Sequence, residues 1–454
     1  MLLNKDVPYA EKLNFVIYLL SRLMTNLGNM VYMFAVSYSI LYTTGSAFYF
    51  SINLALMTLV SLLLLPFSGW LSDVWNKRTL IISGEIMMTF IIGGLLVYSY
   101  LYGFNLIAVY ITTVLASFIN PFISNAYQAV MTEMFHADRI QKVMGYTSSI
   151  MSSAVILGPA FGGVLFGLFD FYVMILVFFI AYFISAVLDF FVKFKLYYDE
   201  ANYVSEEDIG EEVLSKADKF KKDISKGFVY IWKSSILKRV FIMAAVINFF
   251  TALLAIYPEK VMIVELGFNP EAVGVINAFD GVGALVAGAV LGSIKQINSP
   301  IRVMKTGLLL LTVMFLLFLL PIYVTMPQLG IMIFFAAMGF IIAVLVQVIN
   351  VPFFTYMQVI TPQNIKGRVF SVVSIFAMSI QPVGTLLYGV LYDFVPYWII
   401  HVVSFLLLLL AITAALKEDI IEGARKQFTA KTAEMENEKE LSKVDSMAVE
   451  SYSD

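Results

Sequence analysis

The side chains of this sequence that could do chemistry are charged and amide groups set inside long apolar stretches. Asp280 lies about ten residues into the apolar segment 271–295, between Phe279 and Gly281. At about 1.5 Å of rise per helical residue, that is about 15 Å deep, where a charge costs about 2.5–3.5 kcal/mol on insertion scales. We expect this carboxyl to exchange a proton or to bind a cationic substrate. The alternative is a structural ion pair, with Arg22 as the partner.

Amide and hydroxyl side chains recur at helical spacing in three other apolar segments. The segment 14–41 carries Arg22, Asn26 and Asn29 three and four residues apart, so that they share one helical face. We expect these stripes to line a water-filled pathway. Hydrogen bonding between helices without substrate contact, worth about 0.6 kcal/mol per bond, is the alternative. The other two stripes are Asn120, Ser124 and Gln128 in 105–133, and Gln347, Asn350 and Gln358 in and directly after 328–357.

Several other chemistries lack the residues they need. The sequence has no Cys and only two His, which leaves no thiol catalysis and no Cys/His metal site. It has no phosphate-binding loop of the G-x-x-x-x-G-K-[ST] type. A net charge of −3 gives no sign of nucleic-acid binding. We therefore expect a protein that is not an enzyme and that uses no metal, cofactor or nucleic-acid partner.

The elements that must position these residues are membrane helices. The 454 residues are 60% hydrophobic and 13% charged, with a mean hydropathy of +0.86, whereas soluble domains are roughly half apolar. A membrane helix needs about 20 apolar residues, and lipid offers the backbone no hydrogen-bond partner. Twelve segments qualify: 14–41, 46–71, 79–101, 105–133, 143–168, 171–193, 239–264, 271–295, 303–324, 328–357, 366–391 and 396–416. The sequence predicts an all-α integral membrane protein with 12 transmembrane helices.

The orientation follows from the distribution of Lys and Arg. Basic residues occur in the N-terminus and after every second predicted helix, as with Lys77 and Arg78, while the loops between have almost none. Lys260 and Arg22 are the departures from this alternation. Because cytoplasmic loops are enriched in basic residues, we expect both termini to be cytoplasmic.

The segment 194–238 is the longest polar interruption and divides the sequence into two parts. It predicts an N-terminal six-helix bundle over 1–193 and a C-terminal six-helix bundle over 239–416. Within this linker, Ile224, Phe228, Ile231 and Trp232 lie at helical spacing and predict an amphipathic helix on the inner leaflet, with a solvated linker helix as the alternative. The charged tail, 417–454, is predicted to be disordered.

The two predicted bundles also resemble each other in sequence. Asn120-Pro121 and Tyr127-Gln128 in the first half correspond to Asn350-Val-Pro352 and Gln358 in the second. Asp170 and Asp393 occupy matching positions further along. Two pseudo-symmetric bundles of this kind are typical of secondary transporters built from parallel repeats.

The stretch Pro66 to Glu85 carries the most specific motif. It contains Gly69-Trp-Leu-Ser-Asp73-Val-Trp-Asn-Lys77-Arg78 between two apolar runs. This string resembles the signature loop of the major facilitator superfamily, and its wording is most similar to the macrolide-efflux branch. The resemblance implies the major facilitator fold. It also implies a cytoplasmic gate in which Asp73 binds the start of the helix near Lys366, with the gating motif comprising Gly69, Asp73, Lys77, Arg78 and Glu85.

A second motif lies in the segment 143–168. Gly158-Pro159-Ala-Phe-Gly162-Gly163 places small residues where helices can touch, and the Pro can bend the helix. The string resembles the G-P-x-x-G-G motif of superfamily members that export substrates in exchange for protons. Helix packing without such a role is the alternative.

Together these resemblances imply a secondary active transporter that expels an amphiphilic, drug-like or macrolide-like compound by alternating access. Its partners would be the small substrate, protons and the lipid bilayer, and the proton gradient would supply the energy. We expect a bacterial, multi-pass cell-membrane protein acting as a monomer. The alternatives are a major facilitator importer or lipid/metabolite transporter, and a non-transporting membrane receptor or scaffold.

Overall fold

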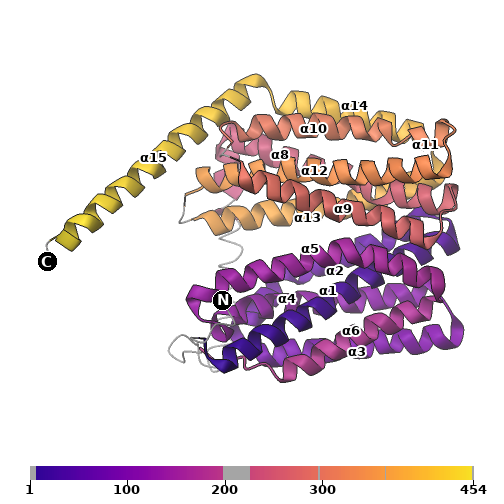
Figure 1. Cartoon of the computed structure of the whole chain (residues 1–454). Coiled ribbons are helices and arrows are strands. Elements are labelled where there is room, and N and C mark those ends of the chain that lie inside the picture. The colour runs from indigo at the N-terminus through magenta and orange to yellow at the C-terminus, as the bar shows by residue number, and fades with distance from the viewer. Residues whose placement is uncertain (1–6, 198–224, 227, 295–296, 363–364, 452–454) are drawn as a thin grey trace.

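A computed structural model describes residues 7–197, 225–226, 228–294, 297–362 and 365–451, and the described part is built of helices. Figure 1 shows two bundles side by side, one coloured indigo to magenta and the other rose to yellow. The N-terminal bundle consists of α1 (Tyr9–Thr44), α2 (Ala47–Val74), α3 (Lys77–Tyr102), α4 (Leu106–Met134), α5 (Ala137–Leu168) and α6 (Phe171–Phe190). The C-terminal bundle consists of α8 (Ser235–Lys260) with the π-helix η3 (Val261–Glu265), α9 (Pro270–Ser293), α10 (Pro300–Leu317) with the short α11 (Leu320–Tyr323), α12 (Gln328–Ile360), α13 (Lys366–Phe394) and α14 (Tyr397–Ala415).

At short polar turns, one helix ends and the next begins. The side chains of Asn76, Asn105 and Asn269 accept bonds from backbone N–H groups in the first turns of α3, α4 and α9, which satisfies donors that have no partner within the helix. Gly45 ends α1 in the left-handed region with φ of 63°. Such caps fix where one helix stops and the next begins, and the predicted segment boundaries differ from the observed ones by a few residues.

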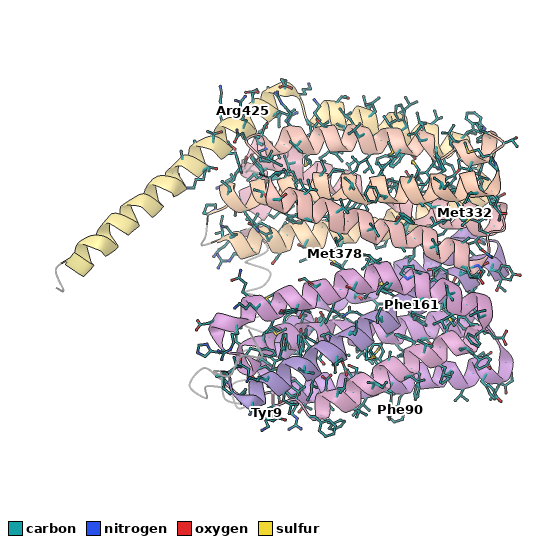
Figure 2. The ribbon with its side chains drawn as sticks, viewed as in Figure 1. Tyr9, Phe90, Phe161, Met332, Met378 and Arg425 are labelled. Carbon is teal, nitrogen blue, oxygen red and sulfur yellow. The ribbon has the colours of Figure 1, made fainter. Side chains whose placement is uncertain are left out.

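Large apolar side chains occupy both the interior and the outer surface of the bundles. Figure 2 shows side chains projecting all along the helices, and Phe90, on the outer side of α3, is 77% exposed. An apolar exterior is expected where lipid replaces water as the solvent. Eleven of the described helices are long and apolar enough to cross a membrane, and α1 is not among them because polar side chains interrupt it.

The two bundles meet through α5 against α9 and α2 against α13. We call the end of the bundles where α1 begins and α14 ends the terminal face, and the other end the opposite face (Figure 1). Near the opposite face, Gly163 of α5 and Gly274 of α9 pack backbone to backbone, and a Cβ on Gly163 would lie 3.0 Å from the Gly274 Cα. Toward the terminal face, a Cβ on Gly145 or Gly288 would meet nothing within 4 Å. The two inner helices therefore touch near one end and separate toward the other.

The predicted disordered tail is wrong for the part of the tail that the structure describes. Residues Glu418–Ser451 form a helix, α15, which leaves the C-terminal bundle at the upper left of Figure 1. Ile421, Ala424 and Phe428 are buried, and the Phe428 ring stacks on Tyr356 of α12 with centroids 6.3 Å apart. Arg302 of α10 forms ion pairs with Glu418 and Glu422. The first turns of the tail thus carry enough apolar surface to dock.

The predicted amphipathic helix of the linker is partly described. Residues 228–233 are helical, Ile231 is buried, and the exposed rings of Phe228 and Trp232 stack with centroids 4.7 Å apart. Residues 198–224, which include Ile224, lie outside the described part of the chain. A location of this helix on the inner leaflet stays a prediction.

Candidate functional site

A cluster of charged side chains is buried inside the N-terminal bundle. The Arg22 guanidinium of α1 donates to Glu85 Oε1 of α3 at 2.9 Å, and lies over the Tyr127 ring with Cζ 3.5 Å from its centroid. The Ser185 hydroxyl donates to Glu85 Oε2 at 2.8 Å. The Tyr127 hydroxyl of α4 donates to Asp189 of α6 and, at 3.3 Å, to Glu85 Oε1. Four helices thus converge on one ionic centre.

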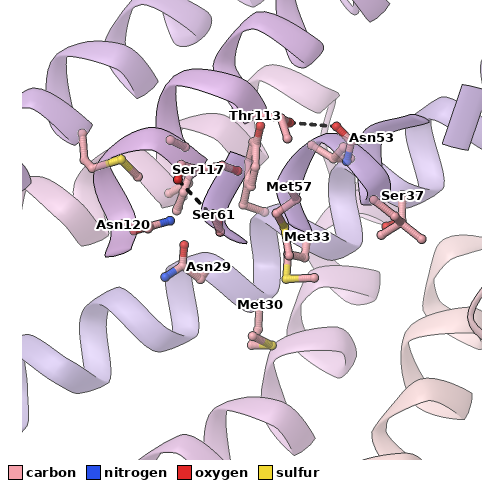
Figure 3. Close-up of a pocket in the computed structure, with 16 residues that line it drawn as sticks. Asn29, Met30, Met33, Ser37, Asn53, Met57, Ser61, Thr113, Ser117 and Asn120 are labelled. Carbon is pink, nitrogen blue, oxygen red and sulfur yellow. Dashed lines mark hydrogen bonds between the residues drawn. The ribbon is translucent and has the colours of Figure 1, made fainter. Parts of the chain in front are cut away.

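One small cavity adjoins this cluster, and a second adjoins the first. The first, of about 190 Å³, is lined by Arg22 and Glu85 together with the predicted stripe residues Asn26, Asn29, Asn120 and Ser124. The second, of about 250 Å³, shares Asn29 and Asn120 and adds the methionines of Figure 3. In that figure the amides of Asn29 and Asn120 face each other, with Met30, Met33 and Met57 beside them. Polar amide groups thus lie next to flexible, apolar methionine side chains, as in sites for amphiphilic ligands.

The C-terminal bundle contains a third cavity, of about 270 Å³, with two carboxylates. Glu259 of α8 accepts a hydrogen bond from the Asn277 amide at 2.6 Å. Asp280, one turn further along α9, rests against Gly339 of α12, where any Cβ would overlap its Oδ1. The remaining lining is mostly apolar and includes Phe318, Phe335 and, from the N-terminal bundle, Met30. The cavity therefore lies between the bundles and combines two acidic side chains with an otherwise mostly apolar lining.

The consecutive residues Glu259 and Lys260, at the end of α8, point in different directions, as successive residues of a helix do. Pro258 lies in the last turn of α8, and the chain continues as the π-helix η3. Pro removes a backbone donor, and short π-helical turns are frequent at functional sites. Glu259 faces the cavity, whereas Lys260 reaches toward the loop between α1 and α2, where its ammonium donates to the Gly45 carbonyl.

The opposite face is closed by a carboxylate. Asp393, near the end of α13, accepts backbone N–H bonds from Ala47 at 2.8 Å and Phe48 at 3.1 Å, and also a bond from the Ser46 hydroxyl. These donors form the N-terminus of α2 in the other bundle, where the helix dipole favours an anion. A further bond joins the bundles nearby, from the Tyr38 hydroxyl to the Phe268 carbonyl at 3.0 Å.

A comparison with known protein families assigns the chain to a family. The profile of the Major Facilitator Superfamily matches residues 18–385. The chain belongs to the Major Facilitator Superfamily. It is similar to YfiS of Bacillus subtilis (strain 168), an uncharacterised MFS-type transporter, with 25% identity over 368 residues that cover 80% of this chain and 83% of the relative. It is a membrane transporter with the major facilitator fold.

Solved transporter structures resemble the whole architecture. A bacterial homologue of the iron transporter ferroportin in an inward-facing state has a TM-score of 0.68 and 14% identity, covering 89% of this chain and 98% of that one. A mutant of the peptide transporter POT has a TM-score of 0.67 and 11% identity, covering 91% and 95%. A bacterial metal transporter has a TM-score of 0.59 and 12% identity, covering 91% and 100%. At such identities the likeness establishes the fold alone.

Within this major facilitator fold, the signature loop is only partly described. The side chain of Asp73 lies outside the described part of the structure, so its predicted contact with α13 stays a prediction. Lys77 forms an ion pair with Glu133 at 2.7 Å, and Arg78 donates to the Phe190 carbonyl at 3.4 Å. A Cβ on Gly69, another member of the predicted gating motif, would find nothing within 4 Å.

Glu85 does not join the rest of the predicted gating motif. The resemblance places it in the cytoplasmic gate, but it is fully buried two turns into α3 and bonded to Arg22. The expected alternative pairing of Arg22 with Asp280 is also wrong for this conformation, since the two residues belong to different bundles and Arg22 is engaged within its own. Sequence spacing within a helix cannot reveal which neighbouring helix supplies the partner.

The Gly-Pro motif of α5 lies at the contact between helices. A Cβ on Gly158 would overlap Met30 of α1, and one on Gly162 would lie 3.1 Å from the Phe34 ring. A Cβ on Gly163 would lie 2.5 Å from the Pro270 carbonyl oxygen of α9. The Pro159 residue between them lines the cavity of Asp280. The motif therefore allows α5 to approach both its own bundle and the other one.

The polar stripes differ in their surroundings. In the N-terminal bundle, Asn29 donates to the Tyr182 hydroxyl at 3.2 Å, and Asn26 bonds the Arg22 carbonyl within its own helix. Four stripe residues are exposed, which fits a wet surface: Ser124 and Gln128 on α4, and Asn350 and Gln358 on α12. Gln347 is half-buried. Apart from Gln128, the N-terminal stripes line the cavities described above, while the stripe on α12 borders none of them.

Sequence reasoning missed two acidic residues of the site. Glu259 lies within the predicted segment 239–264, and a carboxylate next to Pro258 in an apolar run is a signal that could have found it. Asp189 lies close to the end of the predicted segment 171–193, yet its side chain is fully buried. In the described residues no three His, Cys, Asp or Glu gather to hold a metal ion.

Proposed function

We propose that this transporter exports amphiphilic cations in exchange for protons, by alternating access of a site between the two bundles. The observation that carries the proposal is the cavity of Glu259 and Asp280, which combines two carboxylates with Phe, Met and Pro side chains. A charge at this depth is costly and is retained for function by default. A bulky cation would gain ionic contacts and apolar contacts at once.

The contacts between the bundles support alternating access. The helix N-terminus of α2 is tied to Asp393 at the opposite face, whereas α5 and α9 separate toward the terminal face. With the terminal face cytoplasmic, as the distribution of Lys and Arg favours, this conformation is closed to the outside. Rocking of the bundles would break the Asp393 contact and open the cavity outward.

Export, rather than import, is supported by the Gly-Pro motif of α5 and by the likeness of the signature loop to the macrolide-efflux branch. The N-terminal cavities add methionine thioethers and amides, which suit a large amphiphile such as a macrolide that also carries an amine. The chain's own cavities favour a cation over a neutral or anionic substrate.

Ethidium, a planar amphiphilic cation, is a suitable probe. Everted vesicles from an efflux-deficient bacterium that expresses the protein should accumulate ethidium when their lumen is acidic, and a protonophore should abolish the accumulation. Asp280→Asn and Glu259→Gln should each lower it at least fivefold. Asp170→Asn, which changes an exposed acid at the opposite face, should leave it within twofold of wild type.

The other outcomes identify the alternatives. Accumulation of the neutral compound chloramphenicol without ethidium would reject a cationic substrate, and loading only of right-side-out vesicles would identify an importer. Ethidium binding to the purified protein without flux in proteoliposomes would favour a receptor or scaffold.

A further inference from the structure

We propose that the opposite face carries a second cation site, which binds quaternary ammonium and similar bulky organic cations and holds the two bundles together while it is occupied. The site is a cavity of about 500 Å³ between the bundles, separate from the cavity of Glu259 and Asp280, which we call the central cavity. Its volume lies within the range of small-molecule sites, about 300–1,000 Å³. The proposal rests on the alternating access proposed above, but not on the exported substrate or on the proton.

Both bundles contribute to the lining of this cavity. In the N-terminal bundle, α1 supplies Tyr38 and Tyr42, and α5 supplies Phe166 and Gly167. The C-terminal bundle supplies η3, the loop after it and Glu271 in the first turn of α9. Among the described residues that line the cavity, Glu271 is the only charged one. Because a cleft with charge of one sign attracts ions of the other, the cavity favours a cation.

The Glu271 side chain has no partner of its own. It is half-buried and forms no hydrogen bond or ion pair with any described residue. It lies across the interface against Gly167 of α5, where any Cβ would overlap its Oε1. The first-turn N–H of Ala272 is capped by Asn269 rather than by Glu271. A carboxylate partly removed from water without a partner is unfavourable, and a bound cation would supply the partner.

Aromatic rings of the N-terminal bundle form another part of the lining. Tyr38 and Tyr42 stack with centroids 5.7 Å apart, and the Phe166 ring lies 5.1 Å from that of Tyr38. Tyr38 is buried and its hydroxyl bonds the Phe268 carbonyl, so its position is fixed. The Tyr42 ring is 71% exposed and can contact a ligand directly. Since aromatic faces attract quaternary ammonium groups, such a cation would contact both the rings and the carboxylate.

The site is complete only while the opposite face is closed. Separation of the bundles would move Gly167 away from Glu271, so the cation should bind the closed conformation in preference. A ligand that binds one of two conformations shifts the equilibrium toward it by the factor 1 + [L]/Kd. At ten times Kd, the population open at this face should therefore fall about tenfold. With this face toward the medium, external cations would restrain outward opening.

Binding of tetraethylammonium to the protein in lipid nanodiscs tests the site itself. The protein carries Asp280→Asn and Glu259→Gln to remove the carboxyls of the central cavity. Saturation-transfer difference NMR should show a saturable signal from the ethyl groups, and Glu271→Gln should reduce it at least fivefold. Asp170→Asn removes an exposed acid just beyond the end of α5 and should leave the signal within twofold. Absence of a saturable signal, or equal losses in the two variants, would overturn the proposal.

A second variant keeps the test decisive if Glu271→Gln does not fold. Tyr42→Ala removes the exposed ring and should weaken tetraethylammonium binding about two- to fivefold, the effect of one cation–π contact at an exposed site. Tyr102→Ala, which removes a ring that is 72% exposed at the end of α3, should leave the Kd unchanged. Equal Kd values for Tyr42→Ala and the parent protein would overturn the assignment to this cavity.

Thiol labelling tests whether the cation holds the bundles together. The chain has no cysteine, so Ser51→Cys, buried where α2 meets Gly389 of α13, reports opening of this face. In nanodiscs, tetraethylammonium at ten times its Kd should slow labelling by a maleimide about tenfold, and Glu271→Gln should remove this protection. Binding without protection would overturn the proposed effect on the bundles.

The same measurement separates this site from the central cavity and from the proposed function. Protection that is lost on Asp280→Asn and Glu259→Gln but kept on Glu271→Gln would place the cation in the central cavity and overturn the proposal. If the wild type exports no ethidium, the proposed substrate class fails, while binding and protection by tetraethylammonium still decide on this site. If Ser51→Cys is never labelled, even with Asp393→Asn, alternating access fails and the proposed hold on the bundles fails with it.

Discussion

The Lys260 ammonium lies 3.1 Å from Asp393 Oδ1, and the same carboxylate accepts two backbone N–H groups at the start of α2. Lys260 and Asp393 belong to the C-terminal bundle, and α2 belongs to the N-terminal one. The pair is therefore positioned to hold the opposite face shut, with Lys260 fixing the carboxylate and also bonding the Gly45 carbonyl.

Asp393→Asn should favour opening at the opposite face. An anion at a partly buried helix N-terminus contributes up to about 2 kcal/mol, which is about 30-fold in an equilibrium constant. The chain has no cysteine, so Ser51→Cys, buried at this contact beside Gly389, gives a clean reporter for a membrane-impermeant maleimide. Labelling from outside should rise at least fivefold on Asp393→Asn. Asp170→Asn, an acid at the matching position whose side chain caps no helix, should not change it.

Lys260→Gln should act through the same contact. The variant removes the ion pair but leaves the carboxylate on the α2 N-terminus, so labelling of the same reporter should increase less than with Asp393→Asn. Combining the two substitutions should give no more than about twofold above Asp393→Asn alone, because the ammonium then has no anion to orient. Fully additive effects on labelling would mean that the two residues act independently.

Gly274→Ala should hinder closure of the opposite face. A Cβ at this position would overlap the Pro159 carbonyl and lie 2.9 Å from the Gly163 Cα. Overpacking of this kind costs about 1–3 kcal/mol, and separation of α5 from α9 would relieve it. We expect a folded protein with raised external labelling and at least tenfold slower ethidium export. Gly288→Ala on the same helix meets nothing within 4 Å and serves as the control; equal behaviour of the two variants would refute the contact's role.

Phe428→Ala should release α15 from the C-terminal bundle. The Phe428 side chain is 2% exposed against Tyr356, and truncation of buried Phe costs about 3–5 kcal/mol. Limited proteolysis should cut within α15 at least tenfold faster than in wild type. Thr429→Ala changes the adjacent exposed residue and should leave the cleavage rate unchanged.

The membrane helices could be predicted from the sequence because the bilayer imposes a length and an apolar composition on each of them. The side-chain partners inside and between the bundles could not be predicted from the sequence. That Arg22 meets Glu85, and that Asp393 caps a helix of the other bundle, depends on how helices far apart in sequence are arranged. The tail shows a different limit. Phe428 lies in a polar segment, and the sequence alone does not show that its few apolar residues pack against the C-terminal bundle.

The interrupted apolar character of α1 has a consequence for biogenesis. Arg22 leaves the ribosome before Glu85 and Asp189 have been synthesised, so α1 enters the insertion machinery with an unpaired guanidinium near its middle. We expect α1 to partition into lipid poorly by itself and to be retained at the translocon until α3 and α6 arrive. Assembly of the first half would then be a concerted event rather than a helix-by-helix one.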